Sequence, residues 1–169
     1  MITGSKEVLC LFFAAITGLY AMRAPTPEEL SAIAELLAEG GLPTDDLAEQ
    51  DLSLYRIEVS GNGVVAVGGL ERCGNTALIR SIATSASVRG RGIASEIVDE
   101  LERISANEGF EDIFLITESA QRYFATKGYS LMDRDNVPHS IRKSRQFSSL
   151  CPNTASVMRK RVGGATNSS

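Results

Sequence analysis

The residues best suited to hold an anion form a short loop that contains two glycines. Residues 88–94 read V-R-G-R-G-I-A and lie between an apolar run and a strongly amphipathic stretch. Gly90 and Gly92 let the backbone turn tightly and approach a ligand closely, because they carry no Cβ atom. The N–H groups at the start of the following helix add donors and a partial positive charge. The loop therefore predicts a phosphate-binding site.

Two known nucleotide-binding loops can be compared with this spacing. A dinucleotide-binding loop has the pattern G-x-G-x-x-G, and an acidic residue follows about twenty positions later at the end of the second strand. Gly90 and Gly92 match, but Ser95 replaces the third glycine, and the acidic residues precede the predicted second strand. The G-x-x-x-x-G-K-[ST] pattern is absent from the sequence. The pattern that fits is R-x-x-G-x-A, beginning at Arg89.

The elements that position this loop follow from the hydrophobic periodicity and from helix start and stop signals. Small-residue turns separate apolar alternating runs, which indicates a hairpin. Strand, loop, helix and strand in succession form a βαβ unit around the glycine loop. The expected elements are helices at 27–39, 43–50 and 93–108, hairpin strands at 53–60 and 64–71, and strands at 76–84 and 112–117.

Arg80 is an unusual residue for the middle of a predicted strand. Strict alternation places it on one face of the strand with Leu78, Ile82 and Thr84. Such an arginine either packs its stem and reaches solvent with its head, or binds a carboxylate or phosphate with its planar donors. Its strand leads directly into the glycine loop. We therefore favour a substrate-binding role.

The composition indicates one globular domain. The chain has 169 residues, of which 43% are hydrophobic and 22% charged, so it can bury a proper core. We expect a domain at residues 20–162, an N-terminal extension of uncertain role at 1–19 and a flexible tail at 163–169. The apolar run at 8–16 is too short to span a bilayer, so no membrane partner is expected.

Charge and cysteine content exclude further classes. The formal net charge of −4 disfavours a general nucleic-acid partner, which needs a basic surface. Cys10, Cys73 and Cys151 contain no C-x-x-C pair, so neither a disulfide framework nor a zinc site is indicated. We expect no metal and a reducing, cytoplasmic location.

At the glycine loop the chain resembles the GCN5-related N-acetyltransferases, the GNAT superfamily, whose pyrophosphate-binding motif is Q/R-x-x-G-x-G/A. The run A-Q-R-Y-F-A-T-K-G-Y at 120–129 is similar to the family's A-x-x-F-Y-x-x-x-G-F. The resemblance covers residues 20–161. It implies an α/β GNAT fold, with a mixed, mostly antiparallel sheet flanked by helices and a central βαβ acetyl-CoA-binding unit.

The resemblance also implies acetyl-CoA as the cosubstrate. Its pyrophosphate would lie on the loop amides, and its pantetheine would run along the end of the strand before the loop. The two loop arginines could add charge-assisted contacts to the phosphates, or be ordinary solvated charges. The expected cosubstrate-binding residues are Ile82, Ala83, Thr84, Arg89, Gly90, Arg91, Gly92, Ile93 and Ala94.

The last third of the chain bears on the acceptor. The segment F-S-S-L-C-P-N-T-A-S-V-M at 147–158 is similar to the ending F-x-S-L-C-P-x-S-A-x-x-M of acetyltransferases associated with arsenic-resistance operons. More loosely, residues 115–117 and the turn at 137–138 resemble the acetyltransferase domain of N-acetylglutamate synthases. Both imply a small acceptor with an amine and a carboxylate, and the first implies a role in arsenic or antimetabolite resistance. A homodimer is compatible with the sequence. The expected substrate-binding residues are Arg80, Thr117 and Arg142.

Acetyl transfer to an amine requires a proton acceptor and stabilisation of a tetrahedral oxyanion. Glu71 and Glu118, each at the end of a predicted strand, are the candidate bases, and Glu71 is favoured. Each could equally be a plain strand-end charge. The family's usual tyrosine acid aligns with Phe124, and Tyr123 should point about 100° away around a helix. No tyrosine acid is therefore assured.

Two other functions remain open on the sequence alone. The missing tyrosine is compatible with a binding module that senses acetyl-CoA without turnover. The three cysteines, Cys10, Cys73 and Cys151, could converge on arsenite or another soft ion, although their spacing does not indicate it.

Overall fold

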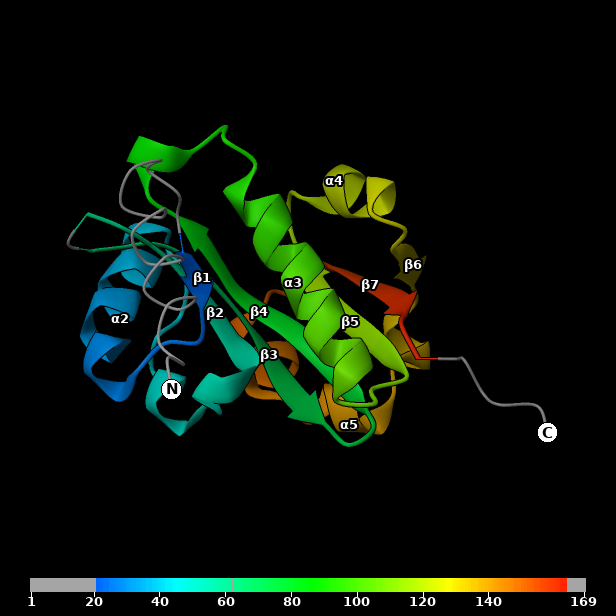
Figure 1. The fold of residues 1–169 in the computed structure, drawn as a ribbon. Coiled ribbons are helices and arrows are strands. Elements are labelled where there is room, and N and C mark those ends of the chain that lie inside the picture. The colour runs from blue at the N-terminus through cyan, green and yellow to red at the C-terminus, as the bar shows by residue number, and fades with distance from the viewer. Residues whose placement is uncertain (1–20, 62, 164–169) are drawn as a thin grey trace, which may run out of the picture.

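The computed structural model describes residues 21–61 and 63–163. These residues form a seven-stranded sheet in the order β1-β2-β3-β4-β5-β7-β6, with helices on both faces (Figure 1). The pair β4 and β5 is parallel, and the other neighbours are antiparallel. The expected α/β class, mixed sheet and β4-α3-β5 unit are confirmed. The elements are β1 Ala21–Arg23, α2 Leu30–Glu39, β2 Tyr55–Ser60, β3 Gly63–Cys73, β4 Thr76–Thr84, α3 Ile93–Asn107, β5 Asp112–Thr117, α4 Gln121–Thr126, β6 Ser130–Met132, α5 His139–Arg142 and β7 Ser156–Arg161.

Local sequence signals account for most of these boundaries. The helix predicted at 27–39 begins as a 3-10 turn at Pro27–Glu29 and continues as α2. The Glu29 carboxylate accepts a hydrogen bond from the Thr26 N–H at 2.8 Å, which satisfies one of the free donors at the helix start. The predicted strands 76–84 and 112–117 match β4 and β5.

The second predicted helix, at 43–50, is wrong. In its place the structure has a loop with one 3-10 turn, Leu47–Glu49. Two side chains of this loop are buried: Leu47 packs in the core beside α2, and Asp46 binds Arg80. Tertiary contacts therefore decide the backbone here, and they override a local helix start signal.

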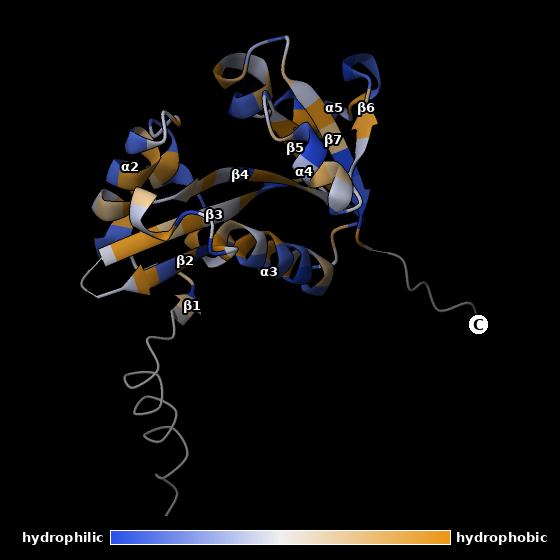
Figure 2. Cartoon of the chain, turned by 90° about the horizontal axis from the view of Figure 1, so that it is seen from above, coloured by the Kyte–Doolittle hydropathy of each residue, from blue (hydrophilic) through white to orange (hydrophobic). Residues whose placement is uncertain are grey.

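Two apolar layers cover opposite faces of the sheet. The buried stripe of α3, which includes Ile97 and Leu101, packs against one face. Ile33 and Leu37 of α2 pack against the other face, where α5 also lies. Figure 2 shows α2 and α3 on opposite sides of the central strands. The sheet is therefore the middle layer, and a ligand bound between its strands would lie between the two apolar layers.

A β-bulge interrupts β4 in its middle. Gly69 lies opposite Arg80 and Val67 opposite Ala83, so one residue of β3 faces two residues of β4. Ser81 takes a left-handed φ of 58°, which is uncommon for a residue other than glycine. The alternation predicted for this strand is therefore wrong beyond Arg80. Ile82 packs on the α3 side with Ile79, whereas Ala83 packs on the α2 side.

The two parallel strands at the centre of the sheet pair over a short distance. The pairing of β4 with β5 runs from Thr76 with Asp112 to Leu78 with Phe114. Beyond these residues the strands diverge, and the backbone of β4 from Ile79 onward no longer pairs with β5. The sheet therefore opens in the middle, next to the glycine loop.

The predicted extension 1–19 and residues 164–169 of the predicted tail lie outside the described residues. Within residues 21–61 and 63–163, no helix is both long and apolar enough to cross a membrane.

Replacing Gly69 by alanine should destabilise the fold. A Cβ atom at Gly69 would lie 2.4 Å from Cζ of Tyr55, whose ring is fully buried. Overpacking of this kind costs about 1–3 kcal/mol. The midpoint of urea unfolding should fall for Gly69→Ala but not for Gly63→Ala, where no atom lies within 4 Å of the added Cβ. Equal midpoints would contradict the packing described.

Glu58 should make stability depend on pH. This side chain of β2 is 2% exposed, and its Oε1 has no hydrogen-bond partner among the described residues. Burial, and then the nearby Glu96, raise the pKa of Glu58 to about 7. The folded protein thus keeps a proton that the unfolded chain releases near pH 4.5, and stability falls as the pH rises towards 7. Glu58→Gln should raise the unfolding free energy at pH 8 by about 1–3 kcal/mol, with most of the gain lost at pH 5. Thermal melts at both pH values test this, and a pH-independent difference would refute it.

Candidate active site

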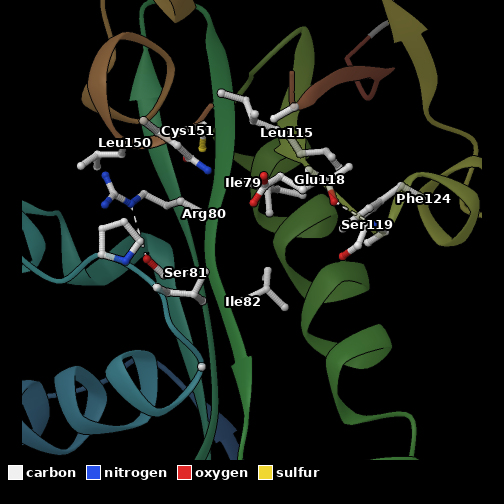
Figure 3. A pocket seen from close by; sticks show the side chains of 18 of the residues that line it. Ile79, Arg80, Ser81, Ile82, Leu115, Glu118, Ser119, Phe124, Leu150 and Cys151 are labelled. Atoms are coloured by element: carbon white, nitrogen blue, oxygen red, sulfur yellow. Dashed lines mark hydrogen bonds between the residues drawn. The ribbon is translucent and has the colours of Figure 1, made fainter. Parts of the chain in front are cut away.

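A cavity of about 630 Å³ lies where β4 and β5 diverge (Figure 3). Its wall comes from both layers of the molecule and from the open part of the sheet itself. The lining residues are Gly40, Gly41, Leu42 and Pro43 after α2, Ile79, Arg80, Ser81 and Ile82 of β4, Ala94 and Val98 of α3, residues 115–120 at the end of β5, Tyr123 and Phe124 of α4, and Gln146, Leu150, Cys151 and Ala155.

The cavity has two chemically different sides. In Figure 3, Arg80 and Ser81 extend to one side of β4, whereas Ile79 and Ile82 extend to the other side, where Glu118 also lies. The core clusters agree, because Ile79 and Ile82 belong to the apolar layer under α3. The cavity therefore passes through the sheet from the α3 layer to the layer that contains α2 and α5.

The glycine loop lies at the start of α3, next to the apolar side of the cavity. Gly90 and Gly92 have left-handed φ values of 77° and 84°, and no atom lies within 4 Å of a Cβ built on either residue. The loop backbone is thus open to a ligand, and Ala94 lines the cavity itself. Ile93 is buried and anchors the helix start, while the Arg89 Nε donates to the Thr84 carbonyl at 3.4 Å. Arg91 is exposed in the same loop.

The predicted strand segment 82–84 meets the cavity at Ile82. Ile82 lines the cavity, and the Ala83 side chain packs on the far face beside α2. Because β4 no longer pairs with β5 here, its edge can offer N–H and C=O groups to an extended ligand.

Arg80 is the centre of a buried ion cluster. Its Nη1 donates to Asp46 Oδ2 and Glu71 Oε2, both at 2.7 Å, and its Nη2 donates to Asp46 Oδ1 at 2.6 Å. The side chains of Arg80 and Asp46 are 5% and 2% exposed. Burial alone would raise the pKa of Asp46, but the hydrogen bonds and charge of Arg80 outweigh it and lower that pKa. Both groups are therefore charged at neutral pH.

The two predicted bases are placed differently. Glu118 lines the cavity, directly after β5. Glu71 lies on β3 with its carboxylate on Arg80, and it is not among the lining residues. The predicted acceptor ligand Thr117 also lines the cavity, and its Oγ1 accepts a hydrogen bond from the Ala120 N–H at 2.9 Å. Arg142 is exposed on α5 and does not line the cavity.

Both aromatic residues of α4 lie on the cavity wall. Phe124 is 7% exposed and packs edge to face on Tyr123, with ring centroids 5.0 Å apart. Tyr123 is 37% exposed, yet it lines the cavity beside Phe124. Tyr123 therefore reaches the site together with Phe124, although successive residues of a helix point about 100° apart. The short helix α4 thus places two successive residues, Tyr123 and Phe124, on the cavity wall.

The two described cysteines are protonated thiols at neutral pH. Burial raises the pKa of Cys73 to about 12, and Cys73 packs among apolar residues such as Leu78 and Phe114. Burial also raises the pKa of Cys151, which lines the cavity. Cys10 lies outside the described residues. Among the residues that the structure covers, no group of three or more His, Cys, Asp or Glu side chains could hold a metal ion.

Comparison with known proteins decides the family. The model of the acetyltransferase (GNAT) family matches residues 17–129, which is more than half of the chain and includes the glycine loop and the run at 120–129. The chain belongs to the GNAT family. This membership agrees with the resemblance of the glycine loop.

Solved structures share the GNAT fold at low sequence identity. N-acetylglutamate synthase from Neisseria gonorrhoeae, complexed with coenzyme A and N-acetyl-glutamate, matches with a TM-score of 0.73 and 16% identity over 86% of this chain. The match covers 36% of the synthase, so this chain spans about a third of that protein. Rv2747 from Mycobacterium tuberculosis, in complex with CoA and NLQ, matches with a TM-score of 0.71 and 18% identity over 83% of this chain and 98% of its own. The ribosomal-protein-S18-alanine N-acetyltransferase from Escherichia coli matches with a TM-score of 0.69 and 12% identity, covering 89% of this chain and 98% of its own.

Several site residues were not found from the sequence. Asp46 reads as one of two adjacent surface acids in a capping position, and nothing local marks it as the buried partner of Arg80. Ser81 reads as an ordinary strand residue, because a bulge has no signature at that position. The π-helical turn Gln146–Leu150 contributes two lining residues and gives no periodic signal.

Replacing Gly92 by alanine should weaken the binding of acetyl-CoA. Alanine would be strained at a φ of 84°, and its methyl group would fill space that is open to a ligand. We expect the dissociation constant, measured by isothermal titration calorimetry, to rise about tenfold or more. Gly61→Ala is the matched control, because Gly61 has a φ of 61° and open space in the hairpin turn. It should lose stability without losing affinity. Equal loss of affinity in both variants would rule out a binding role for the loop.

Proposed function

We propose that this GNAT protein transfers the acetyl group of acetyl-CoA to the amine of a small, amino-acid-like acceptor. The observation that carries the proposal is the cavity through the open sheet, with the glycine loop beside its apolar side and Arg80 on its polar side. Two reactants can meet there from opposite faces. Family membership supports acetyl transfer, and the coenzyme A complexes of the structural neighbours support the cosubstrate.

The cosubstrate would lie along the α3 side. The pyrophosphate fits the open backbone of Gly90 and Gly92 and the first N–H groups of α3, where the helix dipole favours an anion. The amide groups of pantetheine can pair with the free edge of β4 at residues 82–84, as an added strand would. Apolar side chains such as Ile79 and Val98 form the wall beside the thioester.

Glu118 is the base in this proposal. The acceptor ammonium must lose a proton before its nitrogen can attack the thioester carbonyl, and Glu118 is the carboxylate on the cavity wall. The nitrogen then bonds to the carbonyl carbon, and the C–S bond breaks when the tetrahedral intermediate collapses. The bulge at Ser81 interrupts the β3–β4 register beside the cavity, and a backbone N–H of this part of β4 is our candidate donor to the oxyanion. Phe124 has no proton to give, so the thiolate leaves unaided or takes a proton from water, and the second proton of the attacking nitrogen is released to water.

The acceptor would lie on the Arg80 side. A guanidinium has five N–H donors, and carboxylates of the protein take three of those on Arg80. Its Nε lies 3.5 Å from the Ser81 hydroxyl, a weak contact that one carboxylate of an amino acid can replace. Thr117 offers a further hydroxyl near Glu118. The contribution of Arg142 would require its exposed side chain to fold over the cavity mouth.

A role in arsenic or antimetabolite resistance rests on the resemblance of residues 147–158, which supply Leu150, Cys151 and Ala155 to the cavity wall. Acetylation of the amine of a toxic amino-acid analogue would remove a charge that its target recognises. The use of acetyl-CoA favours the cytoplasm as the site of action.

Glu118→Gln should abolish most of the turnover. Loss of a general base lowers the rate about 100-fold or more, and kcat should fall while the dissociation constant of acetyl-CoA stays unchanged. Thiol release in the presence of a panel of amino acids and small amines measures the rate. Glu71→Gln is the comparison variant and should retain more activity. A larger loss for Glu71→Gln than for Glu118→Gln would assign the base to Glu71 instead.

A further inference from the structure

The cavity wall carries an uneven charge. Among the described residues, the charged side chains that line it are Arg80 and Glu118. An acceptor with a carboxylate needs a cation on this wall, and Arg80 is the one that the wall offers. The electrostatics of the acceptor side therefore depend on how much of the Arg80 charge is free.

Two carboxylates of the protein more than cancel that charge. Asp46 binds the end of the guanidinium through both of its oxygens, and Glu71 binds Nη1 from the β3 side. The side chains of Arg80, Asp46 and Glu71 are 5%, 2% and 21% exposed, so all three are mostly buried. Charges in such an environment are screened far less than at the surface. The cluster thus carries one net negative charge on the acceptor side, and Glu118 adds a second carboxylate to the cavity wall from the other side of β4.

The neighbouring cations do not reverse this sign at the wall. Arg134 does not line the cavity. Its guanidinium stacks on the Phe147 ring at 4.4 Å and donates to the Ala155 carbonyl at 2.9 Å. Arg145 is exposed and also lies outside the lining, although its charge contributes to lowering the pKa of Asp46. The charges of Arg134 and Arg145 act on the cavity through intervening protein and solvent, whereas Asp46 is in direct contact with the guanidinium of Arg80.

We propose that Asp46 is a specificity-determining residue that restricts the acceptor to amines without net negative charge. The inference rests on the proposed function and names the substrate class of the same site. The zwitterion of an amino acid with an uncharged side chain fits this wall, because its ammonium faces Glu118 and its one carboxylate faces the Nε side of Arg80. An acidic amino acid brings a second carboxylate into a wall that has no free cation to receive it, and like charges in contact strongly disfavour binding.

Glutamine and glutamate are the probes that test this, because they have the same shape and differ by one charge. The assay is thiol release with saturating acetyl-CoA, and asparagine with aspartate serves as a second matched pair. In the unmodified protein, kcat/KM for the amide should exceed that for the acid about tenfold or more, with the difference mainly in KM. Equal or better use of the acids would overturn the inference and leave acetyl transfer standing.

Asp46→Asn carries the second part of the test. The variant removes one buried charge and frees part of Arg80, so the preference for glutamine over glutamate should shrink at least about threefold. Asp45→Asn is the matched control, since Asp45 is exposed one residue away and its loss should leave the ratio unchanged. If Asp46→Asn does not fold, Glu71→Gln removes the other partner of Arg80 and should shift the ratio in the same direction. An unchanged ratio in the folded variant would overturn the role of Asp46. If neither pair is acetylated while acetyl-CoA binds with its usual affinity, the proposed function fails, and this inference with it.

Discussion

The constraint on which the rest of the structure depends is the short pairing of β4 with β5. Two parallel strands that stayed paired would form a closed central sheet buried between two apolar layers. Here the ladder ends at Leu78 and Phe114, and the space beyond it is the cavity. The opening leaves backbone groups of β4 without strand partners. A buried backbone N–H or C=O group needs a hydrogen-bond partner, so the opening favours the binding of a polar ligand.

The bulge at Ser81 adjusts the chemistry on the two sides of this opening. Arg80 lies on the polar side by ordinary alternation, and the extra residue after it returns Ile82 to the apolar side next to Ile79. Gly68 on β3 makes this arrangement possible, because a Cβ there would lie 2.4 Å from Ile97 of α3. The bulge in β4, the glycine opposite it on β3 and the close approach of α3 therefore depend on one another.

The sequence was sufficient for the fold and for the cosubstrate loop because their signals are local. A continuous apolar run predicts β5, helical periodicity predicts α3, and the two glycines mark the loop between β4 and α3. The acceptor side was less predictable because its geometry depends on long-range contacts. Asp46 meets Arg80 across 34 positions of the chain, and no local pattern specifies that pair. The sequence identifies candidate bases by residue type and by position at the end of a strand. It does not distinguish Glu71 from Glu118, because only the structure shows that Glu118 lines the cavity and Glu71 does not.

The passage of the cavity through the sheet also has a kinetic consequence. If the cosubstrate enters from the layer of α3 and the acceptor from the layer of α2 and α5, neither reactant blocks the entrance of the other. Both can be bound at once, and the acetyl group can then move directly between them without resting on a side chain of the protein. Each product can also leave by the entrance through which its parent molecule came. The same opening that interrupts the sheet thus favours a sequential order of events over a double displacement.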